Sequence, residues 1–240
     1  MKVALLLYGQ PRSIDNLKVY NSHKLHILDK YDTDVFCHTW YKPDTILPVS
    51  SWSKLNNVVC PNNSIDIIKE YYKPKVLYYE EPKYFYNSKI SNSKEITVFN
   101  YANDSNISNI ISQLYSIDNV SKLFIQYSNT TGTVYDFVIV ARYDIIIHEF
   151  PNLTTLDRNF FYTMNHHPRF PDIFFIFNPF FIESQNTYNN LDTIVKKIID
   201  HTIPKEDYWE FSAECLKFNN FLIYFHRSLI RGILIKEERN

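Results

Sequence analysis

Short apolar runs that alternate with helical patterns constrain the fold of this chain more than any other feature of its sequence. Four such runs are predicted as strands, at residues 2–8, 34–38, 75–80 and 136–141. Three helical patterns separate them, at residues 14–29, 65–72 and 104–128. Because strands that alternate with helices pair mainly in parallel, the sequence predicts an α/β fold with a mixed, mainly parallel sheet flanked by helices.

The boundaries of the helices are predicted from capping residues and from apolar spacing. Ser13 and Ser64 are expected to cap the first two helices, because a serine side chain accepts a hydrogen bond from the first turn. The third helix carries an apolar face that includes Leu114 and Ile117 at helical spacing. Gly132 is expected to end this helix, since glycine readily adopts the left-handed conformation of a helix terminus.

The second half of the chain has a more mixed pattern. Further strands are predicted at residues 145–147, 159–164, 173–177 and 222–235, and helices at residues 182–201 and 207–220. Residues 42–63 and 82–103 are predicted as long connections. Because no internal repeat or linker divides the sequence, we expect a single domain over residues 1–240.

Composition argues against several classes of function. The chain has 25 basic and 26 acidic residues and no basic stripe, so nucleic acid is not an expected partner. No apolar stretch approaches the roughly 18 residues of a membrane span, so no transmembrane segment is expected. The three cysteines, Cys37, Cys60 and Cys215, form no Cys-x-x-Cys motif. Their pattern fits a reducing, cytoplasmic compartment.

Glycine is rare enough to exclude the common phosphate-binding loops. The only glycines are Gly9, Gly132 and Gly232, so neither a dinucleotide fingerprint nor a Walker A loop can be assembled. A Gly-x-Ser-x-Gly nucleophile elbow is excluded for the same reason. Gly9 is informative because it directly follows the first strand, where a positive φ or a close backbone approach is useful.

Polar residues follow three of the buried strands. They are Gly9-Gln10-Pro11-Arg12, His38-Thr39-Trp40 and Arg142-Tyr143-Asp144. In an open α/β sheet, ligands bind outside the carboxyl ends of the strands, so we expect these segments to lie at one binding edge.

Two interpretations are open for the third segment. Arg142 and Asp144 project to the same side if the strand continues, and they can form a simple local ion pair. Alternatively, Asp144 holds a divalent cation that bridges two phosphates, while Arg142 binds phosphate oxygens directly.

The remaining candidate residues are isolated in the sequence. His38 can hold a diphosphate and Trp40 can stack on a base or sugar, although a lone histidine is more often structural. Asp172 and Glu214 are candidates for the base that deprotonates an acceptor hydroxyl.

The chain resembles a family of glycosyltransferases of bacteria, phages and large DNA viruses. The matching segments occur in order along most of the chain, at residues 6–12, 34–40, 112–117, 135–144, 171–175 and 212–214. The resemblance implies a GT-A-type, Rossmann-like sheet that binds a nucleotide-diphosphate sugar, often with Mn²⁺ or Mg²⁺. Residues 1–150 would then form the nucleotide-sugar-binding half, and residues 151–240 the acceptor side. A viral member would act in the host cytoplasm.

The resemblance also assigns expected roles to individual residues. The nucleotide pocket would be lined by Tyr8, Gly9 and Arg12, and we place Gln10 and Gln113 there as well. Asp144 would stand where the Asp-x-Asp motif of that fold ends, as the metal ligand. Position 142 departs from the motif because it is arginine, so Arg142 is a candidate to neutralise the leaving diphosphate itself.

The function expected from these observations is transfer of a sugar from a nucleotide-diphosphate sugar to a hydroxyl of a glycan or other acceptor. The alternative is a non-catalytic protein that binds glycans or nucleotide sugars on a degenerate transferase scaffold, which would account for the incomplete acidic motif. A nucleotidyl- or phosphotransferase is a third interpretation, although its usual paired carboxylates are missing.

Overall fold

The computed structural model describes residues 1–47, 58–83, 104–164, 173–190 and 224–234, together with residues 85 and 193. Eight strands form one sheet in the order β5-β2-β1-β6-β9-β8-β10-β7. Four of them are β1 (Lys2–Gly9), β2 (Asp32–Trp40), β5 (Val76–Glu80) and β6 (Phe137–Arg142). The others are β7 (Ile145–Glu149), β8 (Phe160–Met164), β9 (Phe174–Phe177) and β10 (Tyr224–Leu234). Two short strands, β3 (Ile46–Leu47) and β4 (Val58–Val59), pair separately.

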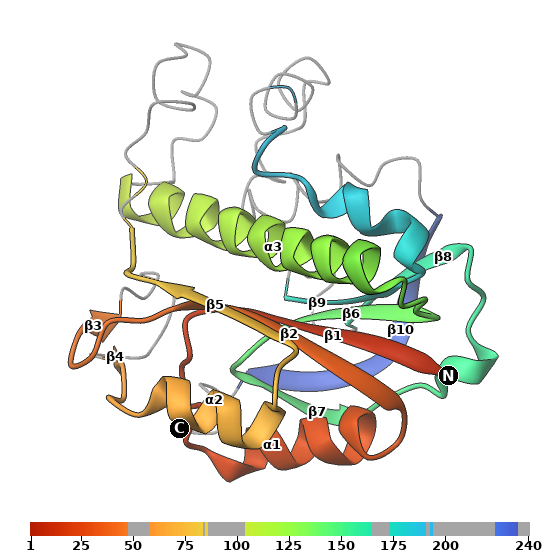
Figure 1. Ribbon diagram of the computed structural model, residues 1–240, viewed down its shortest axis with the longest axis horizontal. Coiled ribbons are helices and arrows are strands. Elements are labelled where there is room, and N and C mark those ends of the chain that lie inside the picture. The colour runs from red at the N-terminus through yellow and green to blue at the C-terminus, as the bar shows by residue number, and fades with distance from the viewer. Residues whose placement is uncertain are drawn as a thin grey trace.

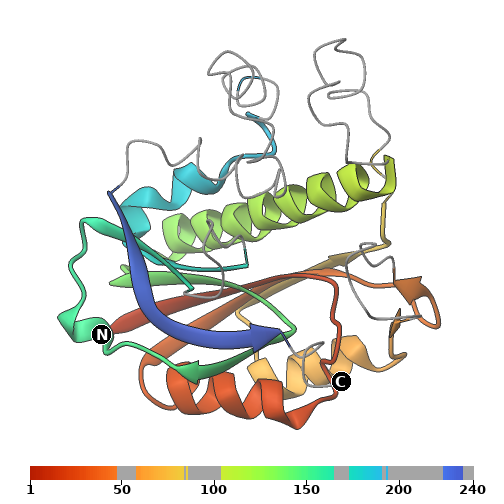
Figure 2. The same cartoon turned by 180° about the vertical axis from the view of Figure 1, so that it is seen from behind.

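The sheet has a parallel half and a mixed half. Strands β5, β2, β1 and β6 are all parallel to one another, as the alternation of strands and helices predicts. Strand β9 then runs antiparallel to both β6 and β8. Strand β10 pairs first with β8 and then with β7, and Figure 2 shows it curving between them. The predicted strand at 145–147 therefore exists as β7, but it is the last strand of the sheet, where it pairs with β10.

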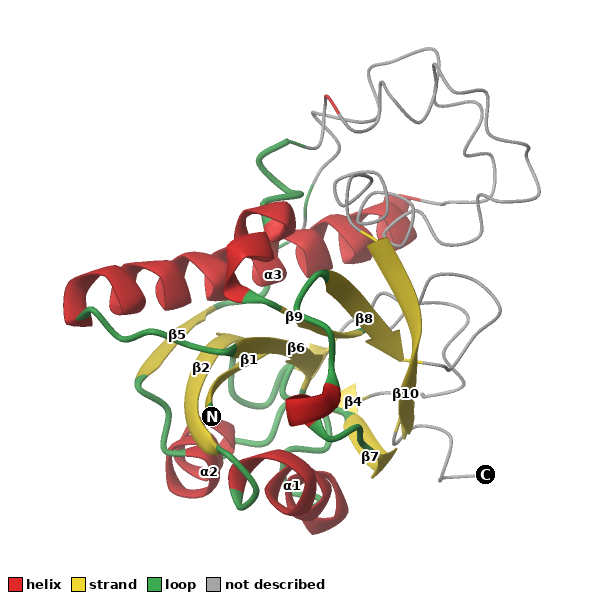
Figure 3. Ribbon diagram, turned by 90° about the vertical axis from the view of Figure 1, so that its right-hand side faces the viewer, coloured by secondary structure: helices red, strands yellow, loops and turns green. Residues whose placement is uncertain are grey.

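Helices cover both faces of the parallel half (Figures 1 and 3). Helix α3 (Asp104–Thr131) lies on one face, and α1 (Leu17–His23) and α2 (Ser64–Tyr72) lie on the other. Alternate residues of β1 serve the two layers: Ala4 and Leu6 belong to the α3 core, and Val3 and Leu5 to the opposite core. A strand buried on both faces needs apolar residues at consecutive positions, which explains why residues 2–8 show no alternation.

The predicted helix boundaries need three corrections. Ser13 has a φ of 54° and does not cap α1; the side chain of Asn16 accepts from the Lys18 amide instead. The helix continues after His23 as a π-helical turn over Lys24–Leu28. Ser64 is the first residue of α2 rather than its cap, because its hydroxyl donates to the Pro61 carbonyl at 2.7 Å.

The helix predicted at 182–201 needs a correction in its first part. Over residues 182–190 the structure has the end of a 3-10 helix, η4 (Pro179–Gln185), followed by a turn. This turn is held to α3, where the Asp118 carboxylate accepts from the Asn189 amide at 3.2 Å. Apart from residue 193, which is helical, residues 191–201 lie outside the described part of the chain. The helix predicted at 207–220 lies outside the described residues, as does Cys215. Helix α3 itself is confirmed, and Gly132, with a φ of 68°, follows its end.

Among the described helices, none combines the length and the apolar character that crossing a bilayer requires. Cys37 and Cys60 are both buried free thiols. Burial raises the pKa of Cys37 to about 12, so its thiol is unreactive at neutral pH. The single domain and its division into two halves stay predictions.

Candidate functional site

The three polar segments predicted at strand ends lie together at one edge of the sheet, where β1, β2 and β6 end. Because these strands are adjacent and parallel, their carboxyl ends face the same side. In the register of the sheet, Tyr8 is paired with His38 on one side and with Arg142 on the other. The expected convergence of the three segments is confirmed, while their role in binding stays a prediction.

A tight turn begins at Gly9. Its φ of 94° lies in a region that glycine adopts easily and other residues adopt only with strain. The Arg12 amide donates to the Gln10 carbonyl at 2.8 Å, and Arg12 Nε donates to Gln10 Oε1 at 2.6 Å. Gly9, Gln10 and Arg12 all have intermediate exposure as whole residues, so this turn places Arg12 at the edge of the sheet.

Arg142 and Asp144 form the local ion pair that was one of the two interpretations. Arg142 Nη2 lies 2.6 Å from Asp144 Oδ2. The pair forms across a turn, because β6 ends at Arg142 and β7 begins at Ile145. The Arg142 side chain is 22% exposed and that of Asp144 only 3%. Within the described part of the chain, Asp144 Oδ1 is buried and accepts no hydrogen bond, which is costly for a carboxylate.

Arg12 belongs to the same charge cluster. Its pKa is lowered to about 10, mainly by burial and then by the positive charge of Arg142, while Asp144 acts in the opposite direction. Taken by themselves, the two guanidinium groups and the one carboxylate of this cluster carry a formal charge of +1. Such a cluster attracts anions, and arginine can bind two oxygens of a phosphate at once.

The same cluster is a poor site for a resident divalent cation. Only one Asp144 oxygen is available, since the other is bound by Arg142. The described residues include no group of three or more His, Cys, Asp or Glu side chains placed to hold a metal ion. Hard cations prefer several oxygen ligands, and two neighbouring guanidinium groups oppose their binding.

A buried row lies beneath this surface. Tyr8, His38 and Trp40 are at most 2% exposed, and Gln113 Nε2 on α3 donates to the Tyr8 hydroxyl at 3.3 Å. Tyr115 stacks on Trp40 with ring centroids 5.4 Å apart. His38 was predicted to hold a diphosphate and Trp40 to stack on a base or sugar. Neither ring is exposed in this arrangement, because α3 covers both.

Three residues beside this row were not identified from the sequence. His38 Nδ1 lies 2.7 Å from Ser116 Oγ, and His38 Nε2 lies 3.1 Å from Glu80 Oε1. Lys83 forms an ion pair with Glu80. Two of the three could have been found from the sequence. Ser116 is a polar residue on the apolar face of the helix, and Glu80 is a polar residue at the end of a fourth strand.

The two candidate bases, Asp172 and Glu214, lie outside the described residues. Asp172 directly precedes Ile173, whose carbonyl accepts from the Arg142 amide at 3.3 Å. The proposed base role of both carboxylates therefore stays a prediction.

Comparisons with known proteins show similarity to solved structures. No protein-family model matches the sequence, and no curated protein matches it either. Among solved structures, the chain is similar to the glycosyltransferase GlyE of Streptococcus pneumoniae TIGR4, with a TM-score of 0.37 and 14% identity. The similarity covers 95% of this chain and 44% of that one, so the chain spans less than half the length of GlyE.

Proposed function

We propose that this protein is a glycosyltransferase that uses a nucleotide-diphosphate sugar as donor. One observation carries the proposal: Arg12 and Arg142 share a positive charge cluster at the carboxyl ends of parallel strands. This edge is the usual ligand-binding position of an open α/β sheet. Two arginines are suited to the two phosphates of a nucleoside diphosphate, since each guanidinium can bind phosphate oxygens bidentately.

The chemistry requires charge neutralisation at one oxygen. The acceptor hydroxyl oxygen forms a bond to the anomeric carbon of the sugar, and its proton passes to a base. The bond from that carbon to the diphosphate breaks, and the diphosphate leaves with the electron pair. Negative charge therefore grows on the diphosphate in the transition state, where Arg12 and Arg142 would stabilise it. Asp172 and Glu214 are the proposed bases.

We infer that the arginines take the place of a metal ion in this reaction. The divalent cation implied by the resemblance does not fit a cluster in which Asp144 offers one oxygen beside two guanidinium groups. No step is assigned to Mn²⁺ or Mg²⁺. The proposed role of Asp144 is to hold Arg142 in place rather than to bind metal, which departs from the role predicted for it.

The test compares nucleotide binding by arginine variants at the two edges of the sheet. Calorimetric titration with UDP, GDP and their sugars, in EDTA or Mn²⁺, should give binding to the natural sequence. Arg142→Ala should weaken the affinity by about tenfold or more, the value of a lost charge-assisted hydrogen bond. Arg12→Ala should act similarly while leaving the pair of Arg142 and Asp144 intact.

Arg158→Ala is the matched control, because Arg158 is also ion-paired with an aspartate, but that aspartate, Asp136, directly precedes β6 and so lies at the opposite edge. It should bind nucleotide like the natural sequence. Absence of binding to any nucleotide, with and without Mn²⁺, would overturn the proposal.

A non-catalytic binding protein is the competing function, and one observation favours it. Asp144 and Glu80, the carboxylates placed beside these strand ends, are both ion-paired, so neither is available as a base. Incubation of the donor sugar with the protein separates the two functions. Release of nucleoside diphosphate that is lost in Arg142→Ala supports the transferase, and binding without any turnover supports the alternative.

A further inference from the structure

A continuous line of hydrogen bonds connects the Gly9 turn to the edge strand β5. The Gly9 amide donates to Ser116 Oγ at 2.9 Å, and Ser116 Oγ lies 2.7 Å from His38 Nδ1. His38 Nε2 lies 3.1 Å from Glu80 Oε1. The line therefore passes from β1 to α3, then to β2 and finally to β5, and it ends at a carboxylate that is 12% exposed.

The line has only one consistent direction. The Glu80 carboxylate, which is ion-paired with Lys83, can only accept, so a neutral His38 carries its proton on Nε2 and donates it to Glu80. His38 Nδ1 is then an acceptor, so Ser116 Oγ donates to it while accepting from the Gly9 amide. Ser116 and His38, the two middle members of the line, thus each receive one of its hydrogen bonds and give one, which fixes the imidazole tautomer and the orientation of the serine hydroxyl.

The surroundings keep this direction stable. Ser116 and His38 are fully buried. Burial lowers the pKa of His38 to about 4, against the opposing effect of Glu80, so the imidazole is neutral at physiological pH. A neutral ring keeps Nδ1 free of a proton, and only then can Nδ1 accept from Ser116.

We propose that Ser116 and His38 are positioning residues that orient the Gly9–Arg12 turn, and through it the diphosphate-binding Arg12, by this one-way line of hydrogen bonds. The inference rests on the proposed function for its link to the nucleotide. Neither residue touches the donor in this proposal, because both are buried beneath the turn. The Gly9 amide is the atom through which they act.

Two substitutions of His38 separate positioning from simple core packing. The oxygen of His38→Asn stands where Nδ1 stands, so it can still accept from Ser116. The amide of His38→Gln reaches toward Nε2, so it can bind Glu80 but leaves Ser116 without its acceptor. Both variants lose ring volume, and a merely structural role would affect them alike.

The readouts are amide hydrogen exchange at Gly9, followed by NMR, and the dissociation constant for UDP. His38→Gln should exchange Gly9 about tenfold faster than His38→Asn and bind UDP several-fold more weakly, as expected for one lost hydrogen bond. In a Ser116→Ala background the two His38 variants should become equal, because the coupling through the hydroxyl is gone. Equal behaviour of the two variants in the natural background overturns the proposal.

The outcome remains interpretable if other parts fail. If both His38 variants unfold, Ser116→Ala alone decides. Unchanged Gly9 exchange and UDP affinity would overturn the proposal, whereas faster Gly9 exchange together with weaker UDP binding supports it. If the natural sequence binds no nucleotide, the proposed function fails and the link to the diphosphate with it. Gly9 exchange then still shows whether Ser116 and His38 orient the turn.

Discussion

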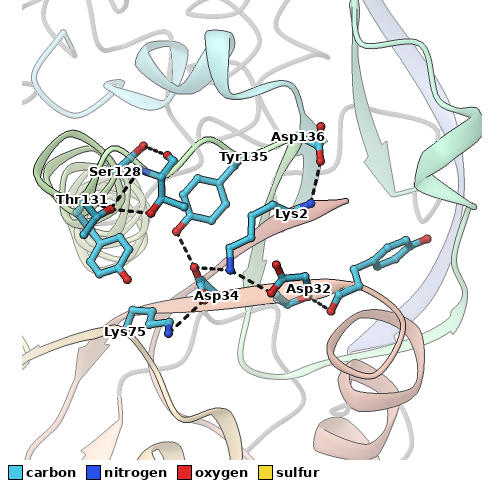
Figure 4. Close-up of polar contacts among 12 residues, drawn as sticks. Lys2, Asp32, Asp34, Lys75, Ser128, Thr131, Tyr135 and Asp136 are labelled. Carbon is cyan, nitrogen blue, oxygen red and sulfur yellow. Dashed lines mark hydrogen bonds and ion pairs between the residues drawn. The ribbon is translucent and has the colours of Figure 1, made fainter.

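The two edges of the parallel half-sheet use the same residue types in opposite ways. At the amino edge, Figure 4 shows Lys2, Asp34 and Tyr135 in one network. Asp34 Oδ2 lies 2.9 Å from Lys2 Nζ and accepts from the Tyr135 hydroxyl at 2.9 Å, and Asp34 Oδ1 lies 3.5 Å from Lys75 Nζ. Both oxygens of this buried carboxylate are therefore paired.

Charges also balance at the amino edge. Three cations face three carboxylates in the network formed by Lys2, Lys75, Arg158, Asp32, Asp34 and Asp136. At the carboxyl edge, Arg142 is ion-paired with Asp144 and Arg12 lies near both, and Asp144 Oδ1 is buried without a partner among the described residues. A buried carboxylate oxygen without a hydrogen bond costs folding free energy. Because such costs are expected mainly at functional sites, this is the physical reason to place the site here.

The largest expected effect comes from breaking the balanced edge. Asp34→Ala leaves Lys2 and the Tyr135 hydroxyl without their acceptor and should reduce the free energy of unfolding by about 3 kcal/mol. Asp32→Ala is the matched control, because Asp32 binds the same lysine but its side chain is 71% exposed. It should cost less than about 1 kcal/mol. Urea unfolding measures both.

Neither aspartate variant should change the affinity for UDP where the protein is folded. Weaker UDP binding by folded Asp34→Ala would show that the two edges are coupled and would contradict their separation into scaffold and site.

Acid should act on the two edges in different pH ranges. The unfolded chain protonates histidine near 6.5, whereas burial lowers the pKa of folded His38 to about 4. The unfolded state therefore binds the extra proton first, and stability should fall as the pH drops from about 6.5 to 4. At the amino edge, burial alone would raise the pKa of Asp34, but bonds from Lys2 and Tyr135 lower it overall. Its contribution is present above about 3.9 and is lost below that value.

Urea unfolding between pH 7.5 and 4.5 measures the first range. His38→Asn should remove roughly 2 kcal/mol of the decrease, while the share of His23, whose pKa burial also lowers to about 4, should persist. The same decrease in the free energy of unfolding for the natural sequence and for His38→Asn would mean that His38 is not held neutral.

The parallel half of the fold was predictable because its signals are local. Each strand there is a continuous apolar run, and the polar residues that end the strands meet at one edge simply because parallel strands share a direction. The position of β7 could not be predicted in this way. It depends on pairing with β10, about 80 residues later in the chain, and nothing within 145–149 specifies that partner.

The sequence predicted which residues lie at the carboxyl edge, but not which of them are exposed and which are buried. Arg142 and Trp40 both follow buried strands, yet Arg142 reaches the surface and Trp40 is covered by Tyr115 from α3. Which strand end a distant helix covers is decided by tertiary packing. The turn at Ser13 illustrates the same limit, since Ser13 has a positive φ and the helix begins only at Leu17, although serine is itself a good capping residue.

The smallest expected effect is the change in UDP affinity caused by Asp144→Asn. Its sign decides whether arginines or a metal ion bind the diphosphate at the carboxyl edge. Asp144→Asn keeps an oxygen that can accept from Arg142 but raises the formal charge of the cluster from +1 to +2. If the arginines bind the diphosphate, UDP should bind about two- to fivefold more tightly, an effect of about 1 kcal/mol or less in a partly exposed site. If Asp144 holds a cation, the same change should weaken binding in Mn²⁺.

Asp136→Asn is the matched control for Asp144→Asn, because it removes the same charge beside an arginine at the amino edge. Calorimetry in EDTA and in Mn²⁺ should show no change in UDP affinity for this control. A tighter complex for Asp144→Asn alone would locate the effect at the carboxyl edge, since both variants change the net charge of the protein equally. Weaker binding that only Mn²⁺ reveals would instead make Asp144 a metal ligand, and the unpaired Oδ1 would then be its coordinating atom.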